Sequence, residues 1–146
     1  MRGERYMPRV AQKGKSFLVL VTSVGLLSLL LSVLGEKIIG VVVTRNNAAA
    51  AATLKTIATG LENYGKEHEG QYPDDFSLLT QGTPPYIDRN YLLESPQSGF
   101  NYFCSRLDRT GYNCSAIPIR CGITGSKNFA VATGNLFVSE DCDKNE

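Results

Sequence analysis

The sequence lacks tryptophan and contains a single histidine, which excludes a catalytic or metal site that needs two imidazole groups. Proline is absent between Pro8 and Pro73, so a long stretch is free of the residue that most strongly breaks helices. The formal net charge is only +1, and this balance gives no electrostatic argument for a nucleic-acid partner. With 146 residues, 42% of them hydrophobic and 20% charged, the composition is that of one globular domain and excludes wholesale disorder.

Charged and apolar residues are unevenly distributed along the chain. The first fifteen residues hold several cations and one acid, Glu4; the cations are Arg2, Arg5, Arg9, Lys13 and Lys15. The next segment, Phe17–Leu34, contains no charged residue, and as an α-helix it is about 27 Å long, close to the hydrocarbon thickness of a bilayer. Its few polar side chains can bond to carbonyls of their own helix, and are therefore compatible with a membrane: Thr22, Ser23, Ser28 and Ser32.

Three interpretations of this apolar segment are open. A buried core helix is disfavoured because so small a chain cannot cover every face of it. A cleaved secretory signal is disfavoured because the run exceeds the usual length of about 7–15 residues and no A-x-A pattern follows it. We favour a single-pass anchor in the cytoplasmic membrane, since basic flanks stay in the cytoplasm. The expected parts are a basic cytoplasmic segment (1–16), a transmembrane helix (17–43) and an extracytoplasmic domain (44–146).

All four cysteines, Cys104, Cys114, Cys121 and Cys142, fall in the part expected outside the cytoplasm, where disulfides persist. A zinc site is the alternative, but the sequence contains no C-x-x-C pair and its one histidine is distant. Four cysteines permit three connectivities. The turn-like residues Asp108–Gly111 place Cys104 and Cys114 symmetrically across a hairpin, which favours Cys104–Cys114 and leaves Cys121–Cys142.

A second helical pattern follows the apolar segment. Apolar residues recur at the helical period and predict one buried stripe: Leu54, Ile57, Ala58, Leu61 and Tyr64. The opposite, solvated face is expected to hold Lys55, Thr59, Glu62 and Lys66. We expect this helix to end at about residue 69, with Gly70 as its C′ residue and Pro73 just beyond.

The remainder of the chain predicts loop and then strands. Asp74 or Asp75 is suited to cap a short helix that carries Phe76, Leu78 and Leu79. Four strand candidates follow in a row: Phe100–Arg106, Tyr112–Ile119, Asn128–Ala132 and Leu136–Ser139. The last two are separated by a hairpin signal, Thr133–Asn135. The expected fold is α+β, with a long N-terminal transmembrane helix packed on a small antiparallel β-sheet, because this arrangement buries both apolar faces.

An ordered series of residues resembles type IV pilin-like proteins, and most closely the major pseudopilins of type II secretion. The series begins with Thr53–Tyr64, His68, Gly70 and Tyr72–Asp74, and continues with Phe100–Tyr102, Ile117–Pro118, Gly122–Phe129 and Gly134. The resemblance covers roughly residues 48–138. It implies an N-terminal helix that is half membrane anchor and half scaffold, a three- or four-stranded sheet wrapped on it, and assembly into filaments by packing of the apolar half-helices.

The N-terminal part departs from the pattern of that family. The family's processing signal is a glycine followed by an aromatic residue, with a glutamate at the fifth mature position. Here Gly14 is followed by Lys15, and Val19 stands at the glutamate position. The calcium loop of the major pseudopilins is not recognisable, whereas a cysteine-closed C-terminal loop, Cys121 to Cys142, is closer to the type IV pilins.

No combination of residues predicts catalysis, a cofactor or a metal. His68 lacks a Gly-x-Ser-x-Gly partner, so we interpret it as structural. The segment Gly122–Lys127 lacks the spacing of a phosphate loop and is interpreted as a turn. Asp74 and Asp75 are interpreted as capping residues, and the acidic residues of 140–146 as a solvated tail rather than a calcium site.

Two functional hypotheses follow, and neither is an enzyme. The first is a pilin-like or pseudopilin-like structural subunit of a type II secretion or type IV pilus-like system, whose partners are the lipid bilayer and other pilin-like subunits. The second is a single-pass envelope protein that does not polymerise and binds a partner through the loop Thr83–Tyr86 or the hairpins. An exported hydrolase has the least support, because no nucleophile–base pair is evident.

Overall fold

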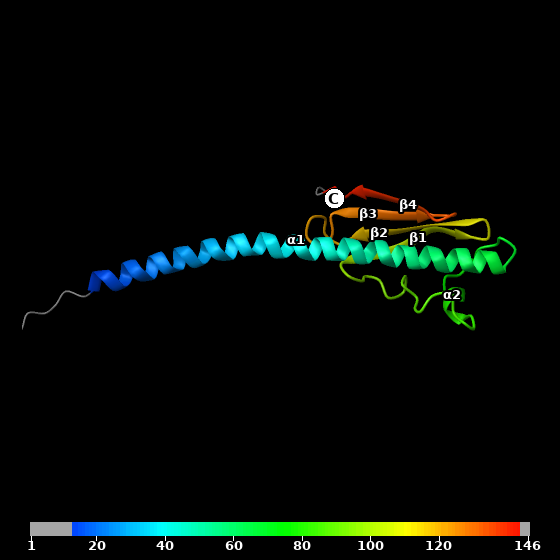
Figure 1. The fold of residues 1–146 in the computed structure, drawn as a ribbon, viewed down its shortest axis with the longest axis horizontal. Helices are drawn as coiled ribbons and strands as arrows, with labels where there is room; N and C mark the ends of the chain where they lie inside the picture. Colours follow the sequence, from blue (N-terminus) through cyan, green and yellow to red (C-terminus); the bar gives the residue numbers. More distant parts are fainter. Residues whose placement is uncertain (1–12, 144–146) are drawn as a thin grey trace, which may run out of the picture. The chain divides into compact units, whose positions relative to one another are not determined.

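The computed structural model describes residues 13–143; residues 1–12 of the expected basic segment, and residues 144–146, lie outside the described residues. The fold is α+β, with a long N-terminal helix and a small antiparallel sheet (Figure 1). The helices are α1 (Lys13–Glu67) and α2 (Leu78–Gln81). The strands are β1 (Phe100–Asp108), β2 (Gly111–Pro118), β3 (Lys127–Ala132) and β4 (Leu136–Asp141).

The chain divides into two compact units, Met1–Ile38 and Ile39–Glu146. The described part of the first unit is entirely helical, from Lys13 onward. The second unit contains the remainder of α1, α2 and the whole sheet. The division falls five residues before the boundary between 43 and 44 expected from the sequence.

One face of α1 forms the spine of the core in the second unit. Four side chains of the predicted stripe, Leu54, Ile57, Ala58 and Leu61, are completely buried, as expected from their spacing, and Tyr64 is half-buried. They pack with the following side chains from the loop and the strands: Phe76, Leu79, Ile87, Phe100, Tyr102, Tyr112, Cys114, Ala116, Phe129 and Val131.

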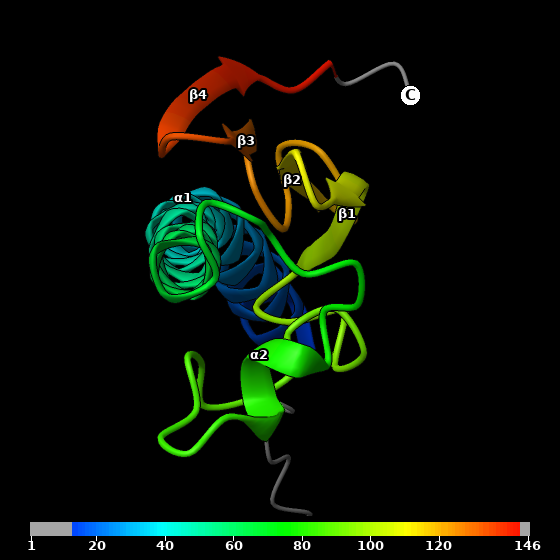
Figure 2. The ribbon, with the colours of Figure 1, turned by 90° about the vertical axis from the view of Figure 1, so that its right-hand side faces the viewer.

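The sheet has the order β1-β2-β3-β4, and every neighbouring pair is antiparallel. Burial alternates along β2, where Tyr112, Cys114 and Ala116 face the core while Asn113 and Ile117 are exposed. This alternation is the signature of a sheet with one buried face. Viewed nearly along the axis of α1, the sheet lies over one side of the helix, and α2 lies on the opposite side (Figure 2).

The turns explain several boundaries. The hairpin between β3 and β4 contains Gly134 and Asn135 with φ angles of 80° and 59°, as its sequence predicts. At the end of α1, Glu69 already has a positive φ of 56°, and the Gly70 amide donates to the Gly65 carbonyl at 2.8 Å. This is a Schellman ending in which Glu69 is C′ and Gly70 is C″. The sequence predicts Gly70 at C′, whereas the structure places the glycine one position further from the helix.

Two elements differ from the sequence expectation. Helix α2 begins only at Leu78, because the Asp75 carboxylate accepts a 2.8 Å hydrogen bond from the Ser77 amide in a turn that precedes the helix. Strand β4 extends to Asp141, so the first acidic residues of the expected tail belong to the sheet. An ion pair between Lys127 and Asp141, with 3.0 Å between the charged atoms, joins the ends of β3 and β4.

Candidate membrane anchor and contact surfaces

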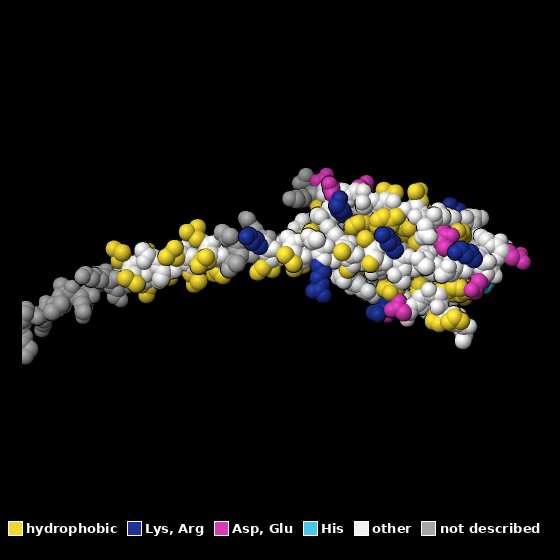
Figure 3. Space-filling model, in the orientation of Figure 1, with side chains coloured by type: hydrophobic (Ala, Val, Ile, Leu, Met, Phe, Trp, Pro, Cys, Tyr) yellow, Lys and Arg dark blue, Asp and Glu magenta, His cyan; other side chains and the backbone are white. Residues whose placement is uncertain are grey.

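The described side chains of the apolar run in the first unit, residues 17–32, are all exposed. Phe17 is 72% exposed and Leu29 67%, values that a helix in a protein core does not show. This helix lies near the N-terminus and is long and apolar enough to cross a membrane. Apolar side chains are spread along the face of this segment that the space-filling view shows (Figure 3).

The hydroxyl groups in this segment have hydrogen-bond acceptors within the helix, as expected. Each donates to a carbonyl oxygen three or four residues earlier: Thr22 to Leu18 at 3.0 Å, Ser23 to Leu20 at 2.9 Å, Ser28 to Val24 at 2.9 Å and Ser32 to Ser28 at 3.0 Å. A hydroxyl without a partner is costly in hydrocarbon. These contacts remove that cost, so the polar residues do not oppose insertion.

Val19 is 64% exposed within this run, at the position where pilin-like proteins have a glutamate. A charge at this depth is expensive unless it is paired. Val19 carries no charge, so this cost does not arise at its position.

In the second unit, the carboxylate of Glu62 binds three separate parts of the structure. It accepts hydrogen bonds from the Tyr112 hydroxyl at 2.8 Å, the Tyr72 hydroxyl at 3.1 Å and the Gly134 amide at 2.7 Å. The sequence placed Glu62 on the solvated face of the helix; its side chain is instead partly buried and joins α1 to β2 and to the β3–β4 turn. No sequence signal links Glu62 to Tyr112, because the two residues are fifty positions apart.

These contacts change the acidities of the groups involved. Burial alone raises the pKa of Glu62, but the hydrogen bonds from Tyr112, Gly134 and Tyr72 outweigh it and lower the pKa below its usual 4.5. Burial and the Glu62 carboxylate raise the pKa of Tyr112 and of Tyr72. Glu62 is therefore ionised at neutral pH, and this arrangement acts as a structural clamp.

An aromatic cluster surrounds the single histidine at the end of α1. The His68 ring stacks on Tyr64, with 3.8 Å between ring centres and 4° between ring planes, and Tyr86 meets Tyr64 edge-on. The Nδ1 atom of His68 lies 2.8 Å from the Tyr64 carbonyl oxygen, and the Tyr86 hydroxyl donates to Glu67. The His68 ring is thus held by contacts with its own helix and with the proline-containing loop.

A shallow hollow of about 330 Å³ lies between the end of α1 and the proline-containing loop. Its lining includes the loop Thr83–Tyr86, which the sequence singled out for partner binding, together with Lys66 and Glu67 from the helix. The hollow therefore has charged side chains of both signs next to Pro84 and Pro85.

The outer face of the sheet carries exposed apolar side chains that the sequence analysis did not single out. Phe103 is 41% exposed, Ile117 40% and Val138 53%, and these residues come from β1, β2 and β4. A hollow of about 360 Å³ on this face includes Ile117 and Val138 in its lining. The sequence could have revealed this face, because residues on one face of a strand recur with period two.

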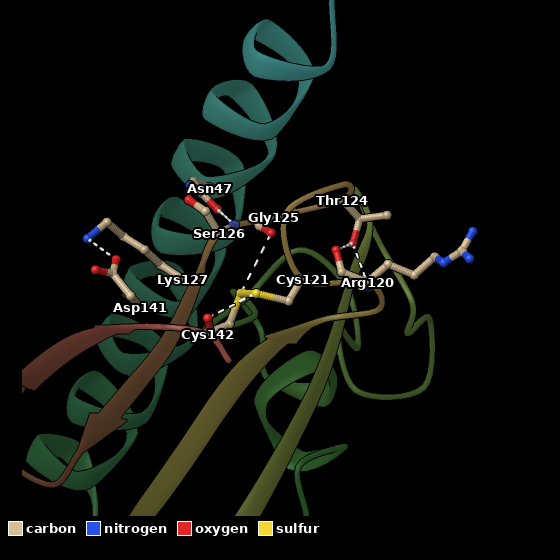
Figure 4. Close-up of a disulfide and its surroundings, with 9 residues drawn as sticks. All are labelled: Asn47, Arg120, Cys121, Thr124, Gly125, Ser126, Lys127, Asp141 and Cys142. Atoms are coloured by element: carbon tan, nitrogen blue, oxygen red, sulfur yellow. Dashed lines mark hydrogen bonds and ion pairs between the residues drawn. A yellow bond between two sulfur atoms is a disulfide. The ribbon is translucent and has the colours of Figure 1, made fainter. Parts of the chain in front are cut away.

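Two disulfides close the second unit, and they are the pairs favoured from the hairpin geometry. Cys104–Cys114 joins directly paired positions of β1 and β2, with 3.9 Å between the Cα atoms. Cys121–Cys142 joins the β2–β3 loop to the residue after β4 (Figure 4). Cys142 also donates its amide to the Ser126 carbonyl at 3.1 Å. The second disulfide therefore fixes the C-terminal end of β4 against the loop.

Within residues 13–143, no group of three or more histidine, cysteine, aspartate or glutamate side chains is arranged to hold a metal ion. Asp75 binds the Ser77 amide, and Asp141 pairs with Lys127. The segment Gly122–Lys127 forms the connection between β2 and β3. The sequence matches no protein-family model and no curated protein, and the structure matches no solved structure.

Proposed function

We propose that this protein is a membrane-anchored, pilin-like or pseudopilin-like structural subunit of a type II secretion or type IV pilus-like system. The first unit anchors it in the cytoplasmic membrane, with the N-terminus in the cytoplasm and the second unit outside. The exposed apolar helix 17–32, whose hydroxyl groups are satisfied internally, is the observation on which the proposal depends. The residue series described for the pilin-like family supplies the assignment to a type of machine.

The orientation is supported by charge and by sulfur chemistry. The cations of the N-terminal segment favour a cytoplasmic location for that side of the helix. The four cysteines form two disulfides in the second unit, and disulfides persist outside the cytoplasm. Both arguments support the proposed extracytoplasmic location of the sheet.

A cross-linking experiment tests assembly. One engineered cysteine at Leu27, a position 58% exposed in the apolar run, should give disulfide-linked dimers in native membranes if apolar half-helices pack against each other. The four native cysteines are already paired, so they do not compete. The matched control is Leu93→Cys in the 82% exposed loop position, which reports random collision. Equal cross-linking at both positions contradicts helix-mediated assembly.

The second candidate is a permanently anchored envelope protein whose second unit is a binding module. Val19 favours it, because the charge that would pair with a neighbouring subunit is absent. The hollow at Thr83–Tyr86 supplies a surface for the partner. N-terminal sequencing of the native protein separates the two: a chain that starts at Lys15 supports the pilin route, whereas an intact Met1 supports the permanent anchor.

A further inference from the structure

Exposed apolar side chains gather at the end of the second unit where the unit begins. On α1, Ile39 is 46% exposed and Val42 43%. On the β2–β3 loop, Ile119 and Ile123 are each 48% exposed. None of these four aliphatic side chains is part of the buried core of the unit.

The β2–β3 loop is held firmly against the helix at this end. The Asn46 side-chain amide donates to the Thr124 carbonyl at 2.8 Å. Asn47 makes two further contacts, donating to the Ser126 hydroxyl at 2.8 Å and accepting from the Ser126 amide at 3.1 Å. Figure 4 shows Asn47, Ser126 and the Cys121–Cys142 disulfide together. The position of the loop relative to this part of α1 is therefore well defined.

Helical spacing places the two apolar groups on one side. Ile39 and Val42 precede Asn46 by seven and four residues, which is two turns and one turn, so all three lie on the same helix face. Asn46 binds the β2–β3 loop from this face. The loop residues Ile119 and Ile123 therefore lie on the same side of the helix as Ile39 and Val42. We call this area the basal surface, and it comprises Ile39, Val42, Arg45, Ile119, Arg120 and Ile123.

Two arginines, Arg45 and Arg120, border the apolar side chains, and both are exposed. The Arg120 side chain extends away from the loop (Figure 4). Two acids lie near this end: Asp141 is paired with Lys127 at 3.0 Å, and Asp143 follows Cys142, whose disulfide joins it to the loop. Aliphatic side chains flanked by cations are the composition of surfaces that bind the interface of an anionic bilayer.

We propose that the basal surface docks onto the lipid headgroups of the membrane that holds the first unit, an inference that depends on the proposed membrane anchoring. Ile39 directly follows the anchoring unit in the chain. The expected transmembrane helix ends at residue 43, and Asn46, where the loop is held, lies about 5 Å further along the helix. A headgroup layer is about 5–8 Å thick, so we expect the side chains of the loop to reach the lipid headgroups if α1 leaves the membrane at residue 43.

Lipid is favoured over a second copy of the chain as the occupant. A stable protein interface uses about 20–30 residues on each side, far more than the four aliphatic side chains and two arginines here. A surface tethered to a membrane meets headgroups at high effective concentration without that large area.

Fluorescence quenching in vesicles tests the proposal on the full-length chain. An environment-sensitive fluorescent amino acid replaces Ile123, and the chain is reconstituted into phosphatidylcholine–phosphatidylglycerol vesicles that contain brominated lipid. The matched control is the same label at Leu136, which is 64% exposed at the other end of β4. We expect the label at 123 to be blue-shifted and quenched severalfold more strongly than the label at 136, at every protein-to-lipid ratio.

Two results would overturn the docking. One is equal quenching at both positions while the protein floats with the vesicles. The other is a spectral change at 123 that disappears when protein is diluted in lipid, which identifies a second copy as the occupant. Failure of the chain to float with vesicles instead contradicts the membrane anchor itself, so the two failures are distinguishable.

A charge variant provides the second measurement. Arg120→Gln removes one cation without touching the disulfides or the core, and it should lower the ratio of docked to undocked protein about fivefold in anionic vesicles. In vesicles of phosphatidylcholine alone the variant and the wild type should behave alike. Identical quenching of both in anionic vesicles contradicts the role of the arginine.

Discussion

The Glu62 carboxylate on α1 accepts a 2.8 Å hydrogen bond from the hydroxyl of Tyr112 on β2, fifty residues later in the chain. The same carboxylate also accepts the Gly134 amide at 2.7 Å in the β3–β4 turn. One side chain therefore fixes the position of the helix relative to the second strand and the last hairpin. Removing this carboxylate should therefore destabilise the whole second unit.

Glu62→Gln should destabilise the second unit by about 1–2 kcal/mol. Hydrogen bonds to a charged acceptor stabilise by about 1.5–3 kcal/mol, and the partial exposure of this site reduces that contribution. Urea unfolding of the protein in detergent measures the change. Glu69→Gln at an exposed position is the control and should change little. The same substitution should cost less free energy of unfolding in a protein that already carries Tyr112→Phe, because the hydrogen bond is then already absent. An equal cost in both backgrounds would contradict a direct coupling between Glu62 and Tyr112.

The contribution of Glu62 should depend on pH. Its pKa is lower in the folded protein than its usual 4.5, so ionised Glu62 favours the folded state above that pH. This stability is lost as the pH falls through the lowered pKa. The difference in melting temperature between wild type and Glu62→Gln should therefore be constant near neutral pH and shrink as the pH falls below 4.5 and through the lowered pKa. A difference that grows on acidification would contradict this sign.

The two disulfides should contribute unequally. Cys121–Cys142 spans 21 positions and Cys104–Cys114 spans 10, and closing the longer loop removes more entropy from the unfolded chain. The double variant Cys121→Ser/Cys142→Ser should lose about 2–4 kcal/mol and release the end of β4. Hydrogen exchange of the β4 amides would detect that release. The variant Cys104→Ser/Cys114→Ser should leave those amides protected.

Gly60→Ala should destabilise the protein despite the higher helix propensity of alanine. A Cβ atom at Gly60 would overlap the Ile87 side chain and lie 3.3 Å from the Tyr86 carbonyl. Such overpacking typically costs about 1–3 kcal/mol. Gly40→Ala is the matched control, because nothing lies within 4 Å of the added atom. Thermal unfolding would compare them, and Ile87→Ala should partly rescue Gly60→Ala if the overlap is the cause.

Leu27→Arg should weaken membrane insertion by about 2.5–3.5 kcal/mol, the cost of a cation at the centre of a spanning helix. Alkaline extraction of membranes measures the released fraction. Ser28→Ala is the control and should remain membrane-bound, because the Ser28 hydroxyl already bonds the Val24 carbonyl. Release of both variants to the same extent would contradict the anchoring function of this segment.

The local elements of the protein followed from the sequence because their causes are local. The uncharged run Phe17–Leu34, the helical spacing of Leu54, Ile57 and Leu61, and the turn at Gly134 each depend on neighbours within a few residues. The Cys104–Cys114 pairing followed too, because a hairpin sets the distance between its own strands, and Cys121–Cys142 was the pair that remained.

Tertiary structure alone decided the contacts between residues distant in the chain. Glu62 has the pattern of a solvated helix residue, and only the fold brings Tyr112 and Gly134 to it. The need for glycine at position 60 arises from Ile87, and the basal surface arises because Asn46 and Asn47 bind the β2–β3 loop. Periodicity shows which face of an element is buried, whereas the identity of its partner is set by how the elements pack.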